Sequence, residues 1–295
     1  ALHLGLLAFG VGPGAEVILP TTACPSVLNA IELSGATPVP CDSNATDFNP
    51  DPTHVKRLIT KRTRALLVPH LFGLPADLDE LKRLDIPIIE DCAQSLGAEY
   101  RSRKTGAFGV FSVCSFYATK LLTTADGGML LTNNRMLAAT ARDLRYSGDK
   151  QNHKLRFNYK LQNLLAAIGL EQLRRLDEFI RQRTSGAALY SQLLGNVAVA
   201  LPKVAPHKKS AWFRYIIHVR SGLGQLQKKL HTAGIAAERP MPLLLHHWFD
   251  RSRKDYPNAE RHFRTALSLP LYPSLTQTDI TNIAETFAGI IRANT

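Results

Sequence analysis

The chain has 295 residues, of which 45% are hydrophobic and 20% charged, and it carries a formal net charge of +12. This composition predicts a folded globular protein with one large core and a smaller second one, and it argues against disorder. No run approaches the roughly 18 consecutive apolar residues of a membrane span, and no basic segment precedes an apolar stretch as in a signal peptide. We therefore expect a cytoplasmic protein with no membrane partner.

The first half of the chain alternates short apolar runs with helical patterns. Strands are predicted at residues 16–20, 37–41, 64–70, 86–91 and 128–134, and helices at 1–10, 26–35, 52–60 and 76–84. Continuous apolar strands between helices indicate an α/β fold with a mostly parallel sheet covered on both faces. Ligands bind such sheets at the carboxyl ends of strands, where Glu90, Asp91 and His70 lie. We interpret His70 as a hydrogen-bonded core histidine.

The second half begins with a long helical pattern over residues 161–194, in which Ser185 and Gly186 mark a candidate break. Loop composition follows over 194–212. Beyond it, a strand near 212–220 and helical patterns at 223–235, 259–265 and 278–293 predict a smaller α+β domain. We expect a large domain over 1–195, including the long connecting helix, and a small domain over 196–295.

Cysteine spacing and charge distribution exclude several classes of site. Cys24, Cys41, Cys92 and Cys114 form no CxxC pair, so we expect neither disulfides nor a metal site. Lys and Arg are dispersed, and two local clusters lack interleaved aromatic residues, so we expect solvated faces and no nucleic-acid partner. These clusters are Lys150, Lys154, Arg156 and Lys160, and Arg174, Arg175, Arg181 and Arg183. A milder alternative is that part of the positive field attracts a phosphorylated small substrate.

The segment "CSFYATKLLTTADGGMLLTNN", residues 114–134, places Lys120 among residues typical of a pocket edge. Taken singly, Asp91 and Lys120 would more often form a buried ion pair. Pyridoxal phosphate, however, needs a lysine amine for a Schiff base, a carboxylate at its ring nitrogen, and hydroxyl and N–H groups around its phosphate. Lys120, Asp91 and Ser115 would meet these needs in that order.

The chain also resembles the DegT/DnrJ/EryC1/StrS family of sugar aminotransferases, which are pyridoxal-phosphate enzymes of the aspartate aminotransferase fold. The resemblance is carried by an ordered set of motifs that includes "GVGPGAEVILP", "IEDCAQSLGAEY", "GAFGVFSVCSFYATKLLTTADGGMLLTNN", "FNYKLQNLLAAIGLEQLRRLDEF" and "LSLPLYPSLT". It implies the type I fold of pyridoxal-phosphate-dependent transferases, with a large cofactor-binding domain and a smaller C-terminal domain.

The resemblance implies a role for each of five residues. Lys120 would be the internal aldimine lysine and the proton carrier between the cofactor's C4′ and the substrate carbon. Asp91 would pair with the pyridine nitrogen, Gln94 would lie near the 3′-oxygen, and Ser115 would bind the phosphate. Asn158 would reach the phosphate of a neighbouring subunit, implying a homodimer with shared active sites. Structural alternatives stay open for three of them: a helix cap for Gln94, a strand-edge hydroxyl for Ser115 and a loop cap for Asn158.

Several positions depart from the family's pattern. Ala15 stands where the family usually has Asp in "GDEVI", Cys24 stands where an aromatic residue often stacks on the cofactor, and Lys160 replaces an arginine. The chain begins at Ala1 inside a predicted helix, before which the family carries "SGT". We therefore expect a further N-terminal segment to precede Ala1, and weaker cofactor binding without it.

The resemblance implies an aminotransferase that moves an amino group from glutamate or glutamine to a keto carbon of a nucleotide-linked sugar. Related dehydratases carry histidine in place of the lysine, so Lys120 argues against that activity. A regulatory or an inactive cofactor-binding member of the family remains the alternative.

Overall fold

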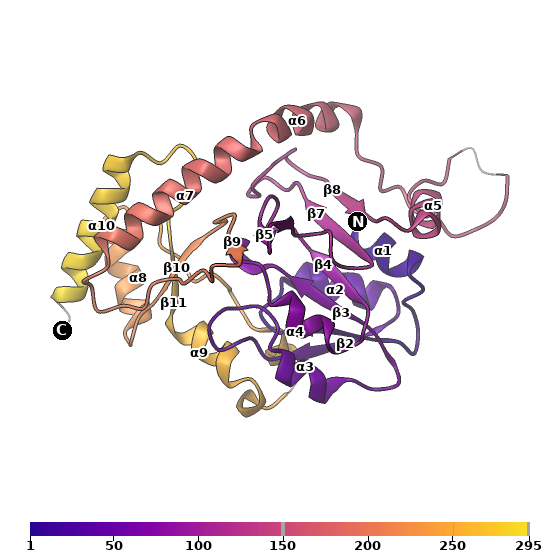
Figure 1. Cartoon of the computed structure of the whole chain (residues 1–295), viewed down its shortest axis with the longest axis horizontal. Coiled ribbons are helices and arrows are strands. Elements are labelled where there is room, and N and C mark those ends of the chain that lie inside the picture. The colour runs from indigo at the N-terminus through magenta and orange to yellow at the C-terminus, as the bar shows by residue number, and fades with distance from the viewer. Residues whose placement is uncertain (149–150, 250, 294–295) are drawn as a thin grey trace.

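The computed structural model describes residues 1–148, 151–249 and 251–293. A six-stranded sheet lies at its centre, with the strand order β2-β1-β3-β4-β7-β8 (Figure 1). The strands are β1 (Glu16–Pro20), β2 (Thr37–Cys41), β3 (Thr63–Pro69), β4 (Ile88–Asp91), β7 (Phe111–Ser115) and β8 (Gly128–Leu131). Neighbouring strands pair in parallel except β7 and β8, which are antiparallel. The predicted α/β fold with a mostly parallel sheet is confirmed.

Alternate side chains of the strands enter two different cores. Val17 and Leu19 of β1 pack with α1 (Leu2–Ala8), α2 (Pro25–Leu33) and α5 (Arg135–Leu144) on one face. Ile18 packs with α3 (Pro52–Leu58) and α4 (Leu78–Lys82) on the other face. Because both faces are covered, the strands are apolar at successive positions instead of alternating with polar residues.

The predicted long helix consists of two helices, α6 (Asn163–Arg174) and α7 (Leu176–Leu193), which meet at Arg175 (Figure 1). The break predicted near Ser185 and Gly186 is wrong, because both residues lie inside α7. A Cβ atom on Gly186 would lie 3.0 Å from Leu271 Cδ1 and 3.1 Å from Ile280 Cδ1. This glycine therefore permits close packing of α7 instead of ending the helix.

The C-terminal part has its own core, formed around β10 (Tyr215–His218), β11 (Ala266–Leu269), α8 (Leu223–Thr232) and α10 (Gln277–Arg292). The C-terminal half of α7 enters this core through Ala187 and Tyr190. Its first turns instead pack against Ala98 and Leu121 of the preceding part. Side chains of α7 thus contact cores on both sides, and the division after residue 195 stays a prediction.

The described residues also form several further, mostly shorter elements. They are η1 (Leu71–Gly73), β5 (Glu99–Tyr100), β6 (Arg103–Lys104), β9 (Lys208–Lys209), η2 (Leu245–Trp248), η3 (Arg253–Asp255) and α9 (Pro257–Thr265). β5 joins β6 and β9 in a three-stranded antiparallel sheet. Among the described residues, no helix combines the length and apolar character needed to cross a bilayer.

Candidate active site

The carboxyl ends of β3, β4 and β7 lie side by side at one edge of the central sheet. Asp91, the last residue of β4, pairs with Pro69 of β3 and with Val113 of β7. A cavity of about 1150 Å³ opens over this edge. Its walls include all five residues that the sequence singled out, namely Asp91, Gln94, Ser115, Lys120 and Asn158. The structure therefore brings these residues together around one space.

Asp91 is a buried carboxyl at the wall of this cavity. Its side chain is only 8% exposed, and its Oδ1 accepts a hydrogen bond from the backbone N–H of Ala93 at 2.9 Å. Burial raises the pKa of the Asp91 carboxyl, and the Ala93 hydrogen bond and the nearby charge of Lys120 offset this only in part. A cationic N–H group in the cavity would therefore stabilise the ionised form of this carboxyl.

Lys120 lies beyond the end of β7, where its backbone N–H donates to the carbonyl of Tyr117 at 3.0 Å. Its Nζ stands 5.5 Å from the centroid of the Phe213 ring, within the range of a cation–π contact. Phe213 precedes β10 in the C-terminal part of the chain. Sequence reasoning missed it, because nothing local connects this phenylalanine with a lysine so far away in the sequence.

Gln94 connects the cavity to the segment that carries Phe213. Its Oε1 accepts a hydrogen bond from the backbone N–H of Phe72 at 2.8 Å, which leaves the amide NH₂ group as a donor. The next residue, Gly73, has φ +92°, and a Cβ atom there would lie 2.7 Å from the backbone nitrogen of Phe213. η1 thus packs directly on the backbone that presents Phe213 to Lys120.

Ser115 and Asn158 contribute polar groups from two sides of the cavity. Ser115 ends β7, and its Oγ lies 3.4 Å from the backbone N–H of Tyr117. Asn158 is exposed and forms an isolated antiparallel bridge with Tyr146. It lines the cavity of its own chain, so the predicted reach into a neighbouring subunit stays a prediction. The first turn of α1 also lines this cavity.

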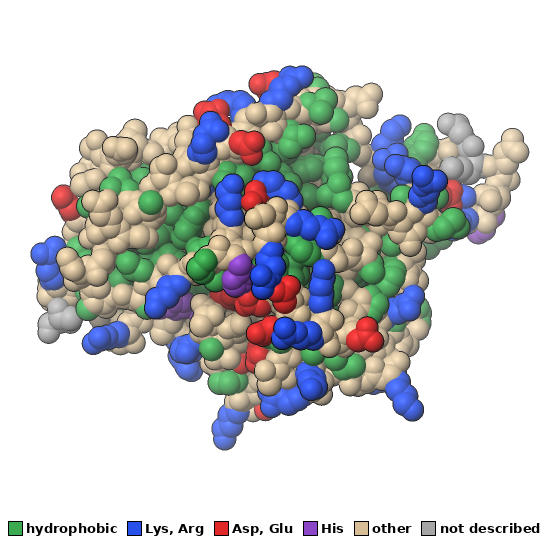
Figure 2. Space-filling view, in the orientation of Figure 1, with side chains coloured by type: hydrophobic (Ala, Val, Ile, Leu, Met, Phe, Trp, Pro, Cys, Tyr) green, Lys and Arg blue, Asp and Glu red, His purple; other side chains and the backbone are tan. Residues whose placement is uncertain are grey.

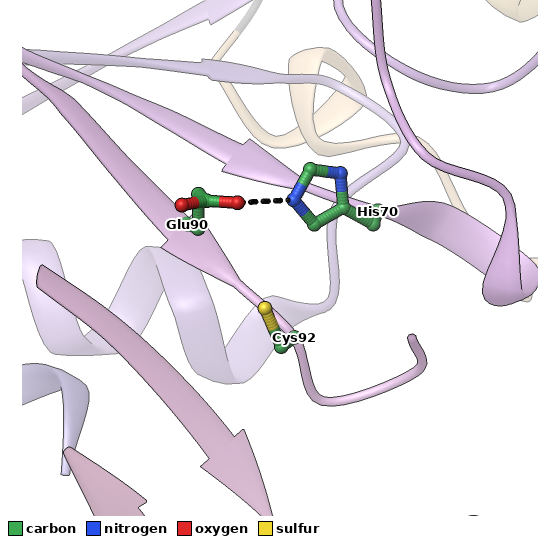
Figure 3. Close-up of side chains that lie close together, drawn as sticks. All are labelled: His70, Glu90 and Cys92. Carbon is green, nitrogen blue, oxygen red and sulfur yellow. Dashed lines mark hydrogen bonds and ion pairs between the residues drawn. The ribbon is translucent and has the colours of Figure 1, made fainter. Parts of the chain in front are cut away.

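A buried network lies beneath this edge (Figure 3). His70 Nε2 and Glu90 Oε2 are 3.0 Å apart, and His70 Nδ1 accepts the N–H of Ala76. Glu90 also accepts the N–H groups of Gly106, Phe108 and Gly109. Burial opposes its ionisation, but the hydrogen bond with His70, helped by backbone N–H groups, keeps the pKa of Glu90 below its ordinary value.

Cys92 lies beside His70 and Glu90 and is buried. Burial raises the pKa of its thiol well above the ordinary value. A metal ion would need a thiolate and free lone pairs, which these saturated groups do not offer. His70 and Glu90 therefore hold the ends of β3 and β4 together, in agreement with the core role predicted for His70.

The polar groups of the cavity match the requirements of pyridoxal phosphate. A buried carboxyl, a lysine amine, a free amide donor and a hydroxyl all reach the same space. Cys24, at the start of α2, is exposed and lines the cavity where the family often places an aromatic ring. The other three cysteines are buried, and all four are free thiols.

A smaller cavity of about 220 Å³ adjoins this region and was not predicted. Thr119, Phe213, Arg214 and Tyr272 are among its lining residues. Arg214 is partly buried, which lowers the pKa of its guanidinium, and its NH1 group lies 3.5 Å from Ser268 Oγ. The neighbours of Arg214 come from distant segments, so no local pattern could reveal this cavity.

The family model described as "DegT/DnrJ/EryC1/StrS aminotransferase family" matches residues 1–288. The GDP-perosamine synthase of Caulobacter vibrioides is 36% identical over 96% of this chain and 81% of its own length. A pleiotropic regulatory protein of Geobacillus stearothermophilus is 34% identical over 99% of this chain and 82% of its own length. The crystal structure of S. venezuelae DesV in complex with a ketimine intermediate superposes with a TM-score of 0.93 at 33% identity, covering 98% of this chain and 82% of DesV.

Proposed function

Because the chain belongs to the DegT/DnrJ/EryC1/StrS aminotransferase family and is thus a pyridoxal-phosphate-dependent sugar aminotransferase, we propose that it aminates a nucleotide-linked keto sugar with glutamate or glutamine as the amino donor. Membership of the family establishes the reaction class and the cofactor. The donor, the nucleotide-linked acceptor and the roles of individual residues are the proposal.

The observation that carries the proposal is the presence of Asp91 and Lys120 in one cavity. When bound, pyridoxal phosphate supplies an electron-accepting ring that stabilises a carbanion at the substrate carbon. Asp91 would bind the ring N–H and hold its proton there. This fits a buried carboxyl that has no closely paired cation in the described part of the chain. Lys120 Nζ would attach the cofactor and then carry a proton to and from the substrate carbon.

Gln94 and Ser115 would orient the cofactor. The Gln94 carbonyl is occupied by the Phe72 N–H, so its NH₂ group can donate to the cofactor's 3′-oxygen. Ser115 Oγ would donate to the phosphate from the end of β7. Phe213 would cover Lys120 from the C-terminal part and exclude water from the amine, which favours proton transfer to substrate over exchange with solvent.

A homodimer with shared sites is the proposed assembly. α6 has no buried residue among its twelve, and Leu164, Leu170 and Leu173 on it are more than half exposed. Hydrophobic side chains gather at the surface alongside α6, near the top of the molecule (Figure 2). An apolar face of this kind is typical of a surface that another protein covers. Asn158 lies shortly before α6, where such a partner would bring the neighbour's cofactor phosphate within reach.

The name of one relative, GDP-perosamine synthase, supports a nucleotide-linked sugar as the acceptor. The name of another, a pleiotropic regulatory protein, keeps a regulatory role as the second candidate. The Asp91 and Lys120 pair supports cofactor binding in either case, so nitrogen transfer is the property that separates the two candidates.

Transfer of a labelled nitrogen tests the proposal. The purified chain, saturated with pyridoxal phosphate, would be incubated with a GDP-linked keto sugar and either glutamate or glutamine labelled with ¹⁵N at the α-amino group, and the sugar analysed by mass spectrometry. We expect ¹⁵N in the sugar with one donor, and none with Lys120→Ala. Cofactor binding without nitrogen transfer to GDP-, UDP- or dTDP-linked keto sugars would favour the regulatory role.

A further inference from the structure

A second cluster of polar side chains lies outside the Lys120 cavity, where η2 meets α9. His247 Nε2 lies 2.6 Å from Glu260 Oε1, and His246 Nε2 lies 3.3 Å from the same oxygen. His246 and Glu260 are buried, and His247 is partly exposed. None of the three lines the Lys120 cavity, so the proposed transamination gives them no role.

One nitrogen of this cluster is buried without a hydrogen bond among the described residues. His246 Nδ1 lies 2.8 Å from the hydroxyl of Thr21, which also accepts the backbone N–H of His246 at 2.9 Å. His246 Nε2 is fully buried and has no hydrogen-bond partner among the described residues. Its approach to Glu260 Oε1 lacks the alignment of a hydrogen bond. A buried polar atom in this state is costly unless a ligand completes it.

We propose that His246, His247 and Glu260 bind a divalent cation, and that zinc is the metal whose chemistry they match best. Two imidazole nitrogens and one carboxylate are a zinc ligand set that leaves a fourth position for water. The sequence analysis predicted no metal site from the spacing of the cysteines, but this cluster contains no cysteine.

The distances between the ligand atoms suit this coordination. Zinc bonds of about 2.1 Å in a tetrahedron place ligand atoms about 3.4 Å apart. The His246–Glu260 separation of 3.3 Å already has this value, and all three ligand atoms lie within 4.8 Å of one another. The His247–Glu260 separation of 2.6 Å would widen by less than 1 Å, which a small side-chain rotation provides.

The surroundings hold the His246 ring in a fixed orientation. The Thr21 hydroxyl on Nδ1 would fix the ring with Nε2 turned toward the ion, as outer partners of metal-bound histidines do.

Two arginines compete with a cation for Glu260. Arg253 Nε and Arg264 NH1 lie 3.7 and 3.9 Å from its carboxylate oxygens. Both side chains are largely exposed, at 72% and 68%, so they can turn into solvent when an ion binds. Their contacts are too long and too exposed to prevent metal binding.

The proposed cation site lies between segments that are far apart in the chain. Thr21 follows β1 in the central sheet, while η2 and α9 belong to the C-terminal half of the chain. A bound ion would fasten η2 to α9, and the Thr21 hydroxyl on His246 would connect this pair to the sheet. Ion binding would stabilise the folded chain by mass action.

Metal titration of the purified 295-residue chain tests the proposal. After removal of metal with a chelator, Zn²⁺ would be added in a calorimeter and Co²⁺ followed by its visible absorption. We expect one ion per chain, an intense four-coordinate Co²⁺ spectrum and a higher melting temperature with Zn²⁺. Glu260→Gln and His247→Gln should each weaken binding by more than about 100-fold, and Thr21→Val by about 10–100-fold.

A matched control is His231→Gln, because His231 pairs with Glu238 on the surface at 3.1 Å and lies outside the cluster. This variant should bind Zn²⁺ as the unchanged chain does. His247 is partly exposed, so His247→Gln is expected to fold, and its metal-free melting curve verifies this. Absence of stoichiometric Zn²⁺ binding, or unchanged affinity in both Glu260→Gln and His247→Gln, would overturn the proposal.

Discussion

Asp91 is proposed to bind the cofactor, but burying its carboxyl reduces the stability of the fold when the carboxyl is ionised. Its folded pKa is raised, so the folded chain holds the carboxyl proton more tightly than the unfolded chain does. The stability contributed by this group is present below the ordinary carboxyl pKa of about 3.9 and is lost as the pH rises through the raised value. Above the raised pKa the ionised side chain therefore destabilises the cofactor-free protein.

Asp91→Asn should accordingly separate activity from stability. We expect the rate of amino transfer to fall by far more than tenfold, because the ring nitrogen of the cofactor loses its anionic partner. In urea unfolding at pH 7, the cofactor-free variant should be at least as stable as the unchanged chain. A rate within about tenfold of the unchanged enzyme, or ~1.4 kcal/mol of barrier, would be too small for the proposed role.

Among single residues, the sequence predicted site groups whose neighbours along the chain reveal them. Asp91 ends a buried strand and Lys120 follows a hydroxyl-rich segment, so the neighbours of each residue indicate a pocket. Phe213, Arg214 and the buried Nε2 of His246 were not predicted. Their surroundings are assembled from segments far apart in the chain, and no local pattern encodes such contacts.

At the element scale, strands and helices were predicted where hydrophobic periodicity determines them. β1, β3 and β4 are apolar because helices cover both faces of the sheet, and that pattern is visible in the sequence. The junction of α6 and α7 was missed because Arg175 leaves the helical path without a glycine or proline to mark it. Gly186 does not mark a break, because a glycine can permit close packing as well as end a helix.

The start of α10 offers a test of the second core. The Thr276 hydroxyl accepts the N–H of Asp279 at 3.1 Å, and the Asp279 carboxylate accepts the N–H of Thr276 at 3.0 Å. α10 places Ile280 and Phe287 in the C-terminal core. Thr276→Ala should therefore lower the free energy of unfolding by about 1 kcal/mol, measured by chemical denaturation.

Thr276→Ser is the matched control, because serine keeps the accepting hydroxyl and should restore most of the stability. Amino transfer by both variants should match that of the unchanged chain under conditions where they are folded. An alanine variant as stable as the serine variant would show that the capping box does not hold α10.

At the scale of the whole molecule, the proposed dimer depends on the exposed apolar face of α6. Leu170→Lys combined with Leu173→Lys should convert a dimer into a monomer in sedimentation velocity, because charged side chains cannot be buried unpaired at an interface. The stability of the isolated chain should change little, since Leu170 is 61% exposed and Leu173 is 53% exposed.

Met136→Lys, on the surface of α5, is the control for added charge and should leave the assembly unchanged, since Met136 is 76% exposed. A double variant that remains dimeric, or an unchanged chain that is monomeric at micromolar concentration with cofactor present, would contradict an interface on α6.

Lys120 is proposed to hold the cofactor, and covalent trapping identifies the lysine that does so. The chain would be saturated with pyridoxal phosphate, reduced with borohydride, digested and analysed by mass spectrometry. Lys160 lines the same cavity, so Lys160→Arg serves as the control against Lys120→Arg. We expect a pyridoxyl group on Lys120 that persists in Lys160→Arg and disappears in Lys120→Arg. A pyridoxyl group found mainly on Lys160 or on another lysine would show that Lys120 is not the attachment site.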